Sequence, residues 1–127
     1  MNVVDSSGWL EYFADGANAD FFAPAIENTT DLIVPTISIF EVFKRVLQQR
    51  SENEALQVAV MMQQGMVIDM DANLALKAAK LSFQLRLPMA DSIILATART
   101  YNADLWTQDS DLEGVEGVKY IRKARIT

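Results

Sequence analysis

Residues 2–13 read NVVDSSGWLEYF, and this stretch decides the fold. Its apolar start, residues 2–4, is typical of a short buried strand that ends at Asp5. Ser6 and Ser7 are candidate N-caps of a helix that would fill the rest of the stretch. A strand that passes directly into a helix is the opening of a β-α-β arrangement, in which the strands run parallel.

Strand and helix patterns continue to alternate along the chain. Further strands are expected at 32–34, 66–68, 104–106 and 118–121, and further helices at 19–27, 36–49, 52–64, 72–85 and 90–101. Pro35 suits a helix start, Gly65 a helix end, and Pro88 a break between two helices. We therefore expect an α/β fold with a parallel or mostly parallel sheet and helices on both faces.

The chain has the size and composition of one globular domain. It has 127 residues, of which 50% are hydrophobic and 22% charged, and it shows no internal repeat or Pro/Gly-rich linker. We expect a single domain over residues 1–127. The N-terminus has no basic stretch before an apolar run, and the apolar stretches are far shorter than a membrane span. These features predict a cytoplasmic protein with no membrane segment.

Two residue types are missing, and their absence restricts the chemistry. The sequence contains neither Cys nor His, which excludes disulfides, thiolate or imidazole metal sites, and Ser-His-Asp or Cys-His catalysis. If the protein is an enzyme, carboxylates and other oxygen groups must carry the chemistry. Such ligands prefer hard cations, so Mg²⁺ or Mn²⁺ is the expected cofactor.

Two acidic residues follow expected strand ends. Asp5 comes directly after the first strand, and Asp109 lies just past the strand at 104–106. In an open α/β sheet, ligands bind beyond the carboxyl ends of the strands where the strand order reverses, so these two acids become neighbours if their strands are adjacent. Capping of the following helix is an equally good interpretation of Asp5.

Two further acids stand in apolar surroundings. Glu41 lies within ISIFEVF, where an unpaired buried carboxylate would be costly, so a metal or a basic partner is expected. Lys44 and Arg45 are close enough in sequence to pair with it. Asp91 lies near an expected helix N-terminus, where its charge would interact favourably with the helix dipole. Taken alone it is therefore best explained as a capping residue, and it is a site candidate only together with the other acids.

The sequence does not match three other kinds of acidic site. Counted from Asp109, a calcium-binding EF-hand loop would need Glu at its twelfth position, where Tyr120 stands, so this reading is rejected. A receiver domain would need an acidic pair after the first strand, but Ser6 follows Asp5, and no late Lys completes its set. An aspartyl phosphatase would need an acid at Ser7.

Four stretches in order resemble the PIN-domain nucleases, and most closely their VapC-like toxins. They are Asp5-Ser6-Ser7, Glu41 in an apolar helix behind Pro35-Thr36, Asp91 before Ser92-Ile93-Ile94-Leu95-Ala96, and Leu105-Trp106-Thr107-Gln108-Asp109. The resemblance implies a single PIN-like domain with strand order 3-2-1-4-5. Leu112 and Glu113 stand where an aromatic residue often follows the last acids in this family.

The resemblance also implies a set of site residues. It points to a catalytic quartet of Asp5, Glu41, Asp91 and Asp109, supported by Ser6, Thr107 and Asp111. We expect the three aspartates of the quartet to contact Mg²⁺ or Mn²⁺, and Glu41 to orient or deprotonate the attacking water.

The function implied by the resemblance is that of a metal-dependent endoribonuclease, the toxin of a toxin-antitoxin pair. RNA, a cognate antitoxin and a second copy in a homodimer are the expected partners. Two alternatives stay open, a catalytically inactive PIN-like binding module and, behind it, an Asp-phosphorylated receiver-type regulatory domain. The net charge of −6 opposes nucleic-acid binding, although four bases near the C-terminus offer phosphate contacts, namely Lys119, Arg122, Lys123 and Arg125.

The aromatic residues exceed what a core alone requires. Most are expected in the core, and some at a dimer or antitoxin surface, with Phe13 and Phe22 as the positions to test. The set is Trp9, Tyr12, Phe13, Phe21, Phe22, Phe40 and Phe43.

Overall fold

The computed structural model describes residues 1–124 and contains one sheet of parallel strands. The strands are β1 (Asn2–Val4), β2 (Leu32–Pro35), β3 (Met66–Ile68), β4 (Asp104–Thr107) and β5 (Val118–Tyr120). Their order is β3-β2-β1-β4-β5, and every neighbouring pair is parallel. The predicted strand order is therefore confirmed, and the sheet is parallel throughout.

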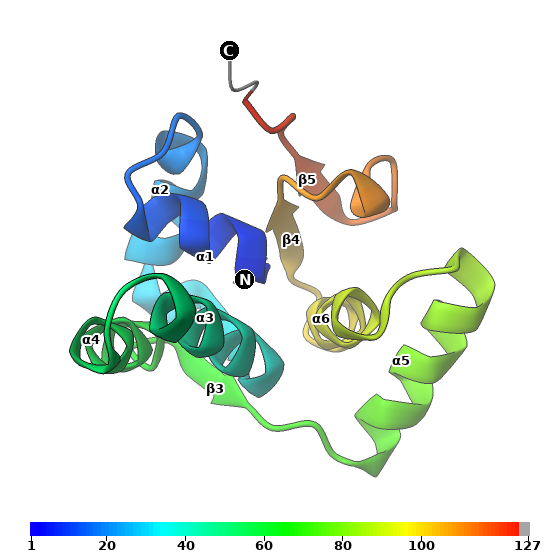
Figure 1. The fold of residues 1–127 in the computed structure, drawn as a ribbon. Coiled ribbons are helices and arrows are strands. Elements are labelled where there is room, and N and C mark those ends of the chain that lie inside the picture. Colours follow the sequence, from blue (N-terminus) through cyan, green and yellow to red (C-terminus); the bar gives the residue numbers. More distant parts are fainter. Residues whose placement is uncertain (125–127) are drawn as a thin grey trace.

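Helices cover both faces of this sheet. They are α1 (Ser6–Phe13), α2 (Ala19–Glu27), α3 (Thr36–Gln49), α4 (Glu52–Met62), α5 (Ala72–Leu85) and α6 (Met89–Thr100), with short 3₁₀ helices η1 (Thr29–Asp31) and η2 (Ser110–Leu112). Figure 1 shows α1 to α4 gathered on one side and α5 and α6 on the other. None of these helices is both long enough and apolar enough to cross a membrane.

Alternation along the strands builds a separate core on each face. Val4 packs with residues of α1 to α4 in one apolar cluster, whereas its neighbour Val3 packs with α6 in another. In β2, Leu32 and Val34 belong to the first cluster and Ile33 to the second. Because successive side chains of a strand point to opposite faces, the apolar residues of β1 and β2 are buried on both sides of the sheet.

One glycine sets how closely α1 approaches the sheet. A Cβ at Gly8 would lie 2.6 Å from the ring of Phe22 and 2.6 Å from a methyl group of Val4. A larger residue there would push the first turn of α1 away from the end of β1. The close approach therefore depends on Gly8.

The element boundaries differ from the expected ones by one or two residues. The helix expected at 52–64 ends at Met62, and the one expected at 90–101 is shifted back by one residue. β4 includes Thr107, and a turn of 3₁₀ helix forms within the loop that follows it. The candidate N-caps Ser6 and Ser7 are wrong, because Asp5 is the N-cap of α1 and accepts a hydrogen bond from the Gly8 amide.

The aromatic residues are mostly core, as expected, but the positions chosen as surface candidates were partly wrong. Phe22 is completely buried and Trp9 nearly so, and both belong to the cluster beneath α1 to α4. Phe13 is partly buried against the same cluster. Phe40 is the member of the set that is largely exposed, at 61%.

Replacement of Phe22 and of Phe40 by Ala should have very different effects on stability. Phe22→Ala should lower the free energy of unfolding by about 3–5 kcal/mol, because it leaves a cavity in the core. Phe40→Ala should change it by about 0.5 kcal/mol or less, because the ring is mainly in water. Urea unfolding followed by circular dichroism measures both, and similar losses in the two variants would contradict the assignment of Phe22 to the core.

Candidate metal centre

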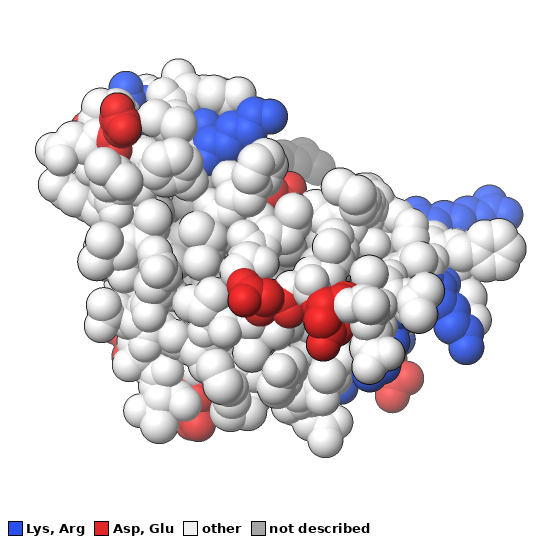
Figure 2. Space-filling model, turned by 90° about the horizontal axis from the view of Figure 1, so that it is seen from below, with Lys and Arg blue, Asp and Glu red and all other residues white. Residues whose placement is uncertain are grey.

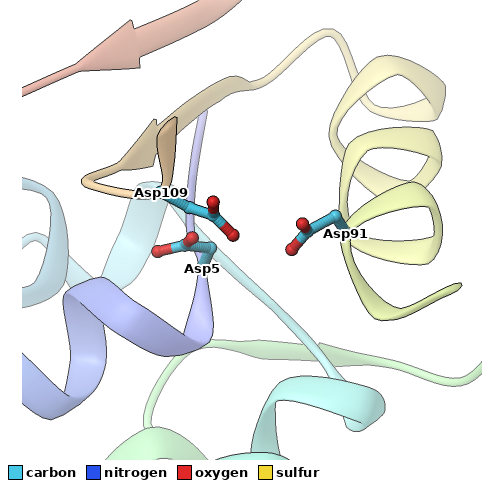
Figure 3. A group of neighbouring side chains, drawn as sticks. All are labelled: Asp5, Asp91 and Asp109. Atoms are coloured by element: carbon cyan, nitrogen blue, oxygen red, sulfur yellow. The ribbon is translucent and has the colours of Figure 1, made fainter. Parts of the chain in front are cut away.

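Three aspartates from distant parts of the chain meet at the carboxyl edge of the sheet. Asp5 follows β1, Asp109 follows β4, and Asp91 lies in the first turn of α6. β1 and β4 are paired in parallel, which brings their ends together as expected. One carboxylate oxygen from each aspartate lies within 4.8 Å of the other two, and Figure 3 shows the side chains pointing toward one another.

Asp5 is the most buried member of the cluster, with 2% of its surface exposed. Its Oδ1 accepts hydrogen bonds from the Gly8 amide at 2.9 Å and from the Ser7 hydroxyl at 2.8 Å, and its Oδ2 accepts one from the Thr107 hydroxyl at 2.5 Å. The pKa of Asp5 is raised to about 6, because the effect of burial outweighs the lowering by these three hydrogen bonds. The same carboxylate caps α1 and faces the cluster, so the two interpretations of Asp5 are compatible.

Asp91 does not serve as a helix cap. The N-cap of α6 is Pro88, and no side chain makes a capping hydrogen bond there. Burial, together with the neighbouring charges of Asp109, Asp5 and Asp111, raises the pKa of Asp91 to about 7. Asp91 thus faces the other acids rather than the backbone of its own helix.

Thr107 and Asp109 are joined to each other and to Asp5. The Thr107 hydroxyl, which is completely buried, donates to Asp5 and accepts a hydrogen bond from the Asp109 amide at 2.8 Å. The Asp109 carboxylate accepts from the Asp111 amide at 2.9 Å and so caps η2. Asp111 itself is exposed, and it acts on the cluster through its charge on Asp91.

Glu41 is outside the tight group of three aspartates and is linked to it through Ser6. The Ser6 hydroxyl donates to Glu41 Oε1 at 2.5 Å, which links α3 to the residue that follows Asp5. Within residues 1–124 the only ion pair joins Lys119 to Asp104, so neither Lys44 nor Arg45 neutralises Glu41 in this way. The alternative in which Lys44 or Arg45 pairs with Glu41 is therefore wrong.

Sequence reasoning did not assign two neighbours of the cluster to the site. Ser7 was interpreted as a helix cap, yet its hydroxyl binds Asp5. Gln108 is 5% exposed, accepts a hydrogen bond from the Asn18 side chain at 3.0 Å, and lies within 3.5 Å of the Ser7 carbonyl oxygen. Gln108 stands between Thr107 and Asp109 in the sequence, and this position alone could have indicated that it lies near the site.

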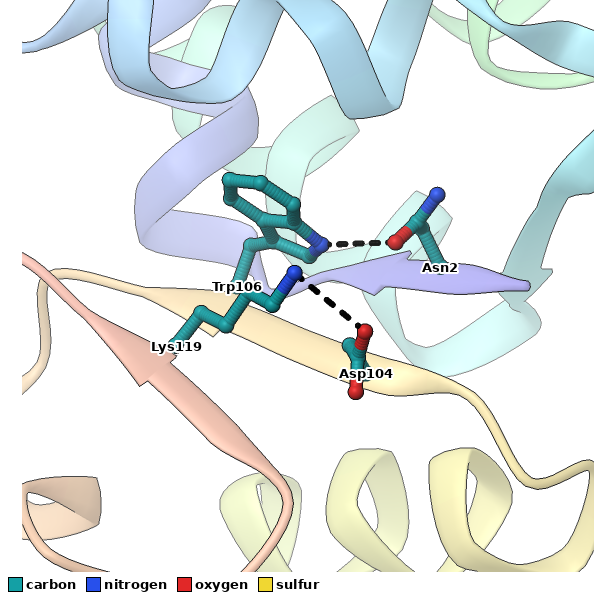
Figure 4. A network of polar contacts seen from close by, with 4 residues as sticks. All are labelled: Asn2, Asp104, Trp106 and Lys119. Carbon is teal, nitrogen blue, oxygen red and sulfur yellow. Dashed lines mark hydrogen bonds and ion pairs between the residues drawn. The ribbon is translucent and has the colours of Figure 1, made fainter.

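The basic C-terminal residues are not a single patch beside the cluster. Lys119 pairs with Asp104 at 3.4 Å and lies over the ring of Trp106, whose indole N–H donates to Asn2 (Figure 4). Asn2 and Asp104 start their strands, whereas the aspartate cluster lies at the strand ends. Arg125, one of the predicted phosphate contacts, falls outside the described residues.

The donor set fits a divalent cation of the Mg²⁺ or Mn²⁺ kind. All the acidic groups offer oxygen, which these hard cations prefer. Raised pKa values for Asp5 and Asp91 mean that the chain alone accommodates their charges poorly. A bound cation would relieve both burial and mutual repulsion.

A comparison with known families decides the assignment of the fold. The PIN-domain family model matches residues 3–118, a range that includes the three clustered aspartates. The chain belongs to the PIN-domain family. The resemblance noted in the sequence is therefore confirmed.

Solved structures share the fold of this PIN domain at low sequence identity. A toxin-antitoxin complex from Klebsiella pneumoniae has a TM-score of 0.78 and 21% identity, over 94% of this chain and 96% of that one. VapC20 from Mycobacterium tuberculosis, described as a sarcin-ricin loop cleaving toxin, has a TM-score of 0.73 and 15% identity, over 91% and 95%. VapBC2 from Rickettsia felis, bound to promoter DNA, has a TM-score of 0.71 and 13% identity, over 95% of this chain and 97% of that one. No curated protein sequence matches the chain.

The pH dependence of the free energy of unfolding should show how much the ionisation of the clustered aspartates destabilises the fold. Folding raises the pKa of Asp91 and of Asp5, so their contribution to stability is complete below about pH 4 and is lost as the pH rises through about 7. In EDTA the free energy of unfolding should fall over this range. Asp91→Asn should be more stable than the parent above about pH 7, by about 1 kcal/mol, because solvent screens this partly exposed group.

Urea unfolding at a series of pH values measures this effect. The matched control is Asp20→Asn, which removes an exposed charge from α2. Loss of stability in Asp91→Asn at high pH, or a gain no larger than that of Asp20→Asn, would contradict the electrostatic account of the cluster.

Proposed function

We propose that this PIN domain is a Mg²⁺- or Mn²⁺-dependent endoribonuclease that hydrolyses RNA phosphodiesters. The observation that carries the proposal is the convergence of Asp5, Asp91 and Asp109, with carboxylate oxygens within 4.8 Å of one another. Three carboxylates at this spacing repel one another when ionised, and a divalent cation is the simplest means of holding them together at neutral pH.

The residues have separate roles in the proposed reaction. Asp5, Asp91 and Asp109 would hold the cation, which supplies positive charge to the scissile phosphate and lowers the pKa of water. Glu41 would orient the attacking water and accept its proton, and the Ser6 hydroxyl fixes the carboxylate that does so. Thr107 and Asp111 act on the ligands, because Thr107 bonds Asp5 and the Asp111 amide bonds Asp109.

The proposed biological role is that of a toxin, held inactive by an antitoxin and acting on RNA in the cytoplasm. The support comes from proteins of the same fold, of which one is described as a toxin that cleaves the sarcin-ricin loop and others as toxin-antitoxin assemblies. These activities belong to those proteins, and at 13–21% identity the toxin role of this chain is our proposal. Its acidic cluster is the feature that such a role requires.

A homodimer is the proposed assembly. Apolar side chains one heptad apart stay exposed on two helices, Phe40 and Leu47 on α3 and Leu76 and Phe83 on α5, with Phe83 at 86% exposure. Figure 2, the view from below, shows a face that is mostly uncharged, with acidic side chains near its middle. Exposed apolar surface of this kind marks an association site, and a second copy of the chain would cover it.

A non-catalytic binding module is the second candidate, and one observation favours it. Asp5 caps α1 and Asp109 caps η2, so both side chains stabilise the fold even without a bound metal. A receiver-type domain is not proposed, because the sheet order differs from the 2-1-3-4-5 order of receiver proteins. In addition, Lys119 pairs with Asp104 at the other end of the strands and does not face the aspartate cluster.

Cleavage of RNA tests the nuclease against the binding module. Purified protein should cut 5′-labelled RNA with Mg²⁺ or Mn²⁺ and stop in EDTA. Asp91→Asn should lower the cleavage rate by roughly 10²–10³-fold, because it removes a proposed ligand. Asp5→Asn should do the same and remain folded, since Asn is also a good N-cap. Asp104→Asn, at the far end of β4, is the control and should cleave normally.

Retained cleavage in Asp91→Asn and Asp5→Asn, or full cleavage in EDTA, would remove the assigned roles. The same variants test the toxin role in cells. Induced expression should arrest growth for the unaltered protein and for Asp104→Asn but not for Asp91→Asn, and sequencing the new RNA 5′ ends identifies the substrate. Growth arrest by folded Asp91→Asn would mean that toxicity does not come from cleavage.

Light scattering after gel filtration tests the proposed dimer. Phe83→Glu should convert a dimer to a monomer, because it places a charge at the most exposed of these apolar side chains, which a second copy would bury. Leu56→Glu, at a similarly exposed apolar position on α4, is the control and should leave the mass unchanged. A monomeric parent protein, or an unchanged mass for Phe83→Glu, would argue against this interface.

A further inference from the structure

A groove of about 500 Å³ begins beside the aspartate cluster and is bordered by α1, α3 and α4. Ser7 and Gln108 line its near end. The Ser7 hydroxyl donates to Asp5, and Gln108 lies between Thr107 and Asp109 in the chain. Ser7 therefore both lines the groove and contacts the cluster, so the near end of the groove lies one side chain away from Asp5.

Helix α3 leads from the cluster along this groove. Glu41 is tied to the cluster edge through Ser6, and Arg45 and Gln49 follow it at intervals of four residues. Residues four apart lie on the same helix face, about 5.4 Å along the axis for each turn. Arg45 and Gln49 both line the groove, so successive turns of α3 carry a carboxylate, a guanidinium and an amide away from the cluster.

The groove carries an excess of positive charge in an acidic protein. Arg45, Arg50 and Lys123 line it, together with the acids Glu11 and Glu54. The three bases form no ion pair within residues 1–124, whereas Glu11 accepts a hydrogen bond from the Asn18 amide at 2.9 Å. Against a net charge of −6 for the whole chain, this is a local reversal of sign that favours an anionic ligand.

An aromatic ring lies on the same groove. Phe13 lines it, and its ring is held by stacking on the buried Trp9, with 5.7 Å between centroids and 20° between planes. Basic side chains that follow a groove, combined with a fixed aromatic ring, are the usual means of holding a single-stranded nucleic acid. The volume lies within the range of about 300–1,000 Å³ common for ligand sites.

We infer that this groove holds the single-stranded RNA next to the scissile phosphate. Arg45, Arg50 and Lys123 contact phosphates of that segment, and Phe13 contacts one base. The inference rests on the proposed function, because it takes the aspartate cluster as the place of cleavage. These residues act on binding and position, and none of them touches the reacting atoms.

Binding in EDTA tests the groove without any cleavage. The probe is a short fluorescein-labelled single-stranded RNA of mixed sequence, and fluorescence anisotropy gives its Kd from about 50 to about 200 mM salt. The groove variant carries Arg45→Gln, Arg50→Gln and Lys123→Gln. The matched control carries Lys77→Gln, Lys80→Gln and Arg99→Gln, which removes the same charge from a second groove between α5 and α6.

The groove variant should bind the RNA at least about tenfold more weakly at low salt, with a slope of log Kd against log salt smaller by about 2. The control should change affinity by about twofold or less. Phe13→Leu should weaken binding by about fivefold with an unchanged salt slope, because it removes stacking and no charge. Equal losses in the two triple variants, or no RNA binding by the unaltered protein, would overturn the inference.

Cleavage measurements separate the failure of this inference from that of the proposed function. With Mn²⁺, the groove variant should show a raised KM and an unchanged kcat. Cleavage that proceeds with the parent KM in the groove variant would overturn the groove and leave the nuclease intact. Groove-dependent binding by a protein that cleaves no RNA would support the groove and count against the nuclease.

Discussion

The hydrogen bond from the Thr107 hydroxyl to the Asp5 carboxylate holds the end of β4 to the end of β1, and the rest of the site depends on it. The Asp5 carboxylate also accepts a hydrogen bond from the Gly8 amide of α1, and the Thr107 hydroxyl accepts one from the Asp109 amide. Two strands, a helix and the loop after β4 are thus joined through one buried carboxylate. Because each of these groups would be costly to leave unpaired in the interior, the geometry of the cluster is fixed by the fold itself.

Burial and repulsion set the electrostatic character of the site. Asp5 receives three hydrogen bonds that favour its ionised form, and its pKa is still raised because it is almost fully buried. Asp91 lacks such donors and faces the charges of Asp5, Asp109 and Asp111, so its pKa is raised further. Packing and backbone geometry hold the acids together, and protonation or a bound cation would offset the repulsion between their charges.

The sequence predicted most of the fold, because alternation and helical periodicity are local signals. It also placed Asp5 and Asp109 correctly at adjacent strand ends, since parallel strands end on one edge. It could not show that the Asp5 side chain caps α1 and faces the cluster at once, or that Ser6 rather than Lys44 or Arg45 contacts Glu41. Those contacts, like the burial of Phe22, depend on how distant elements pack, which local patterns do not encode.

The order of the strands has a consequence for protein synthesis. β4 sits beside β1 in the middle of the sheet, although it is made after three-quarters of the chain. The ribosome releases the N-terminal segments first, and they cannot complete the central pair until residues 104–109 emerge. A nascent or truncated chain that lacks residues 104–109 therefore has neither the β1–β4 pair nor an assembled acidic cluster.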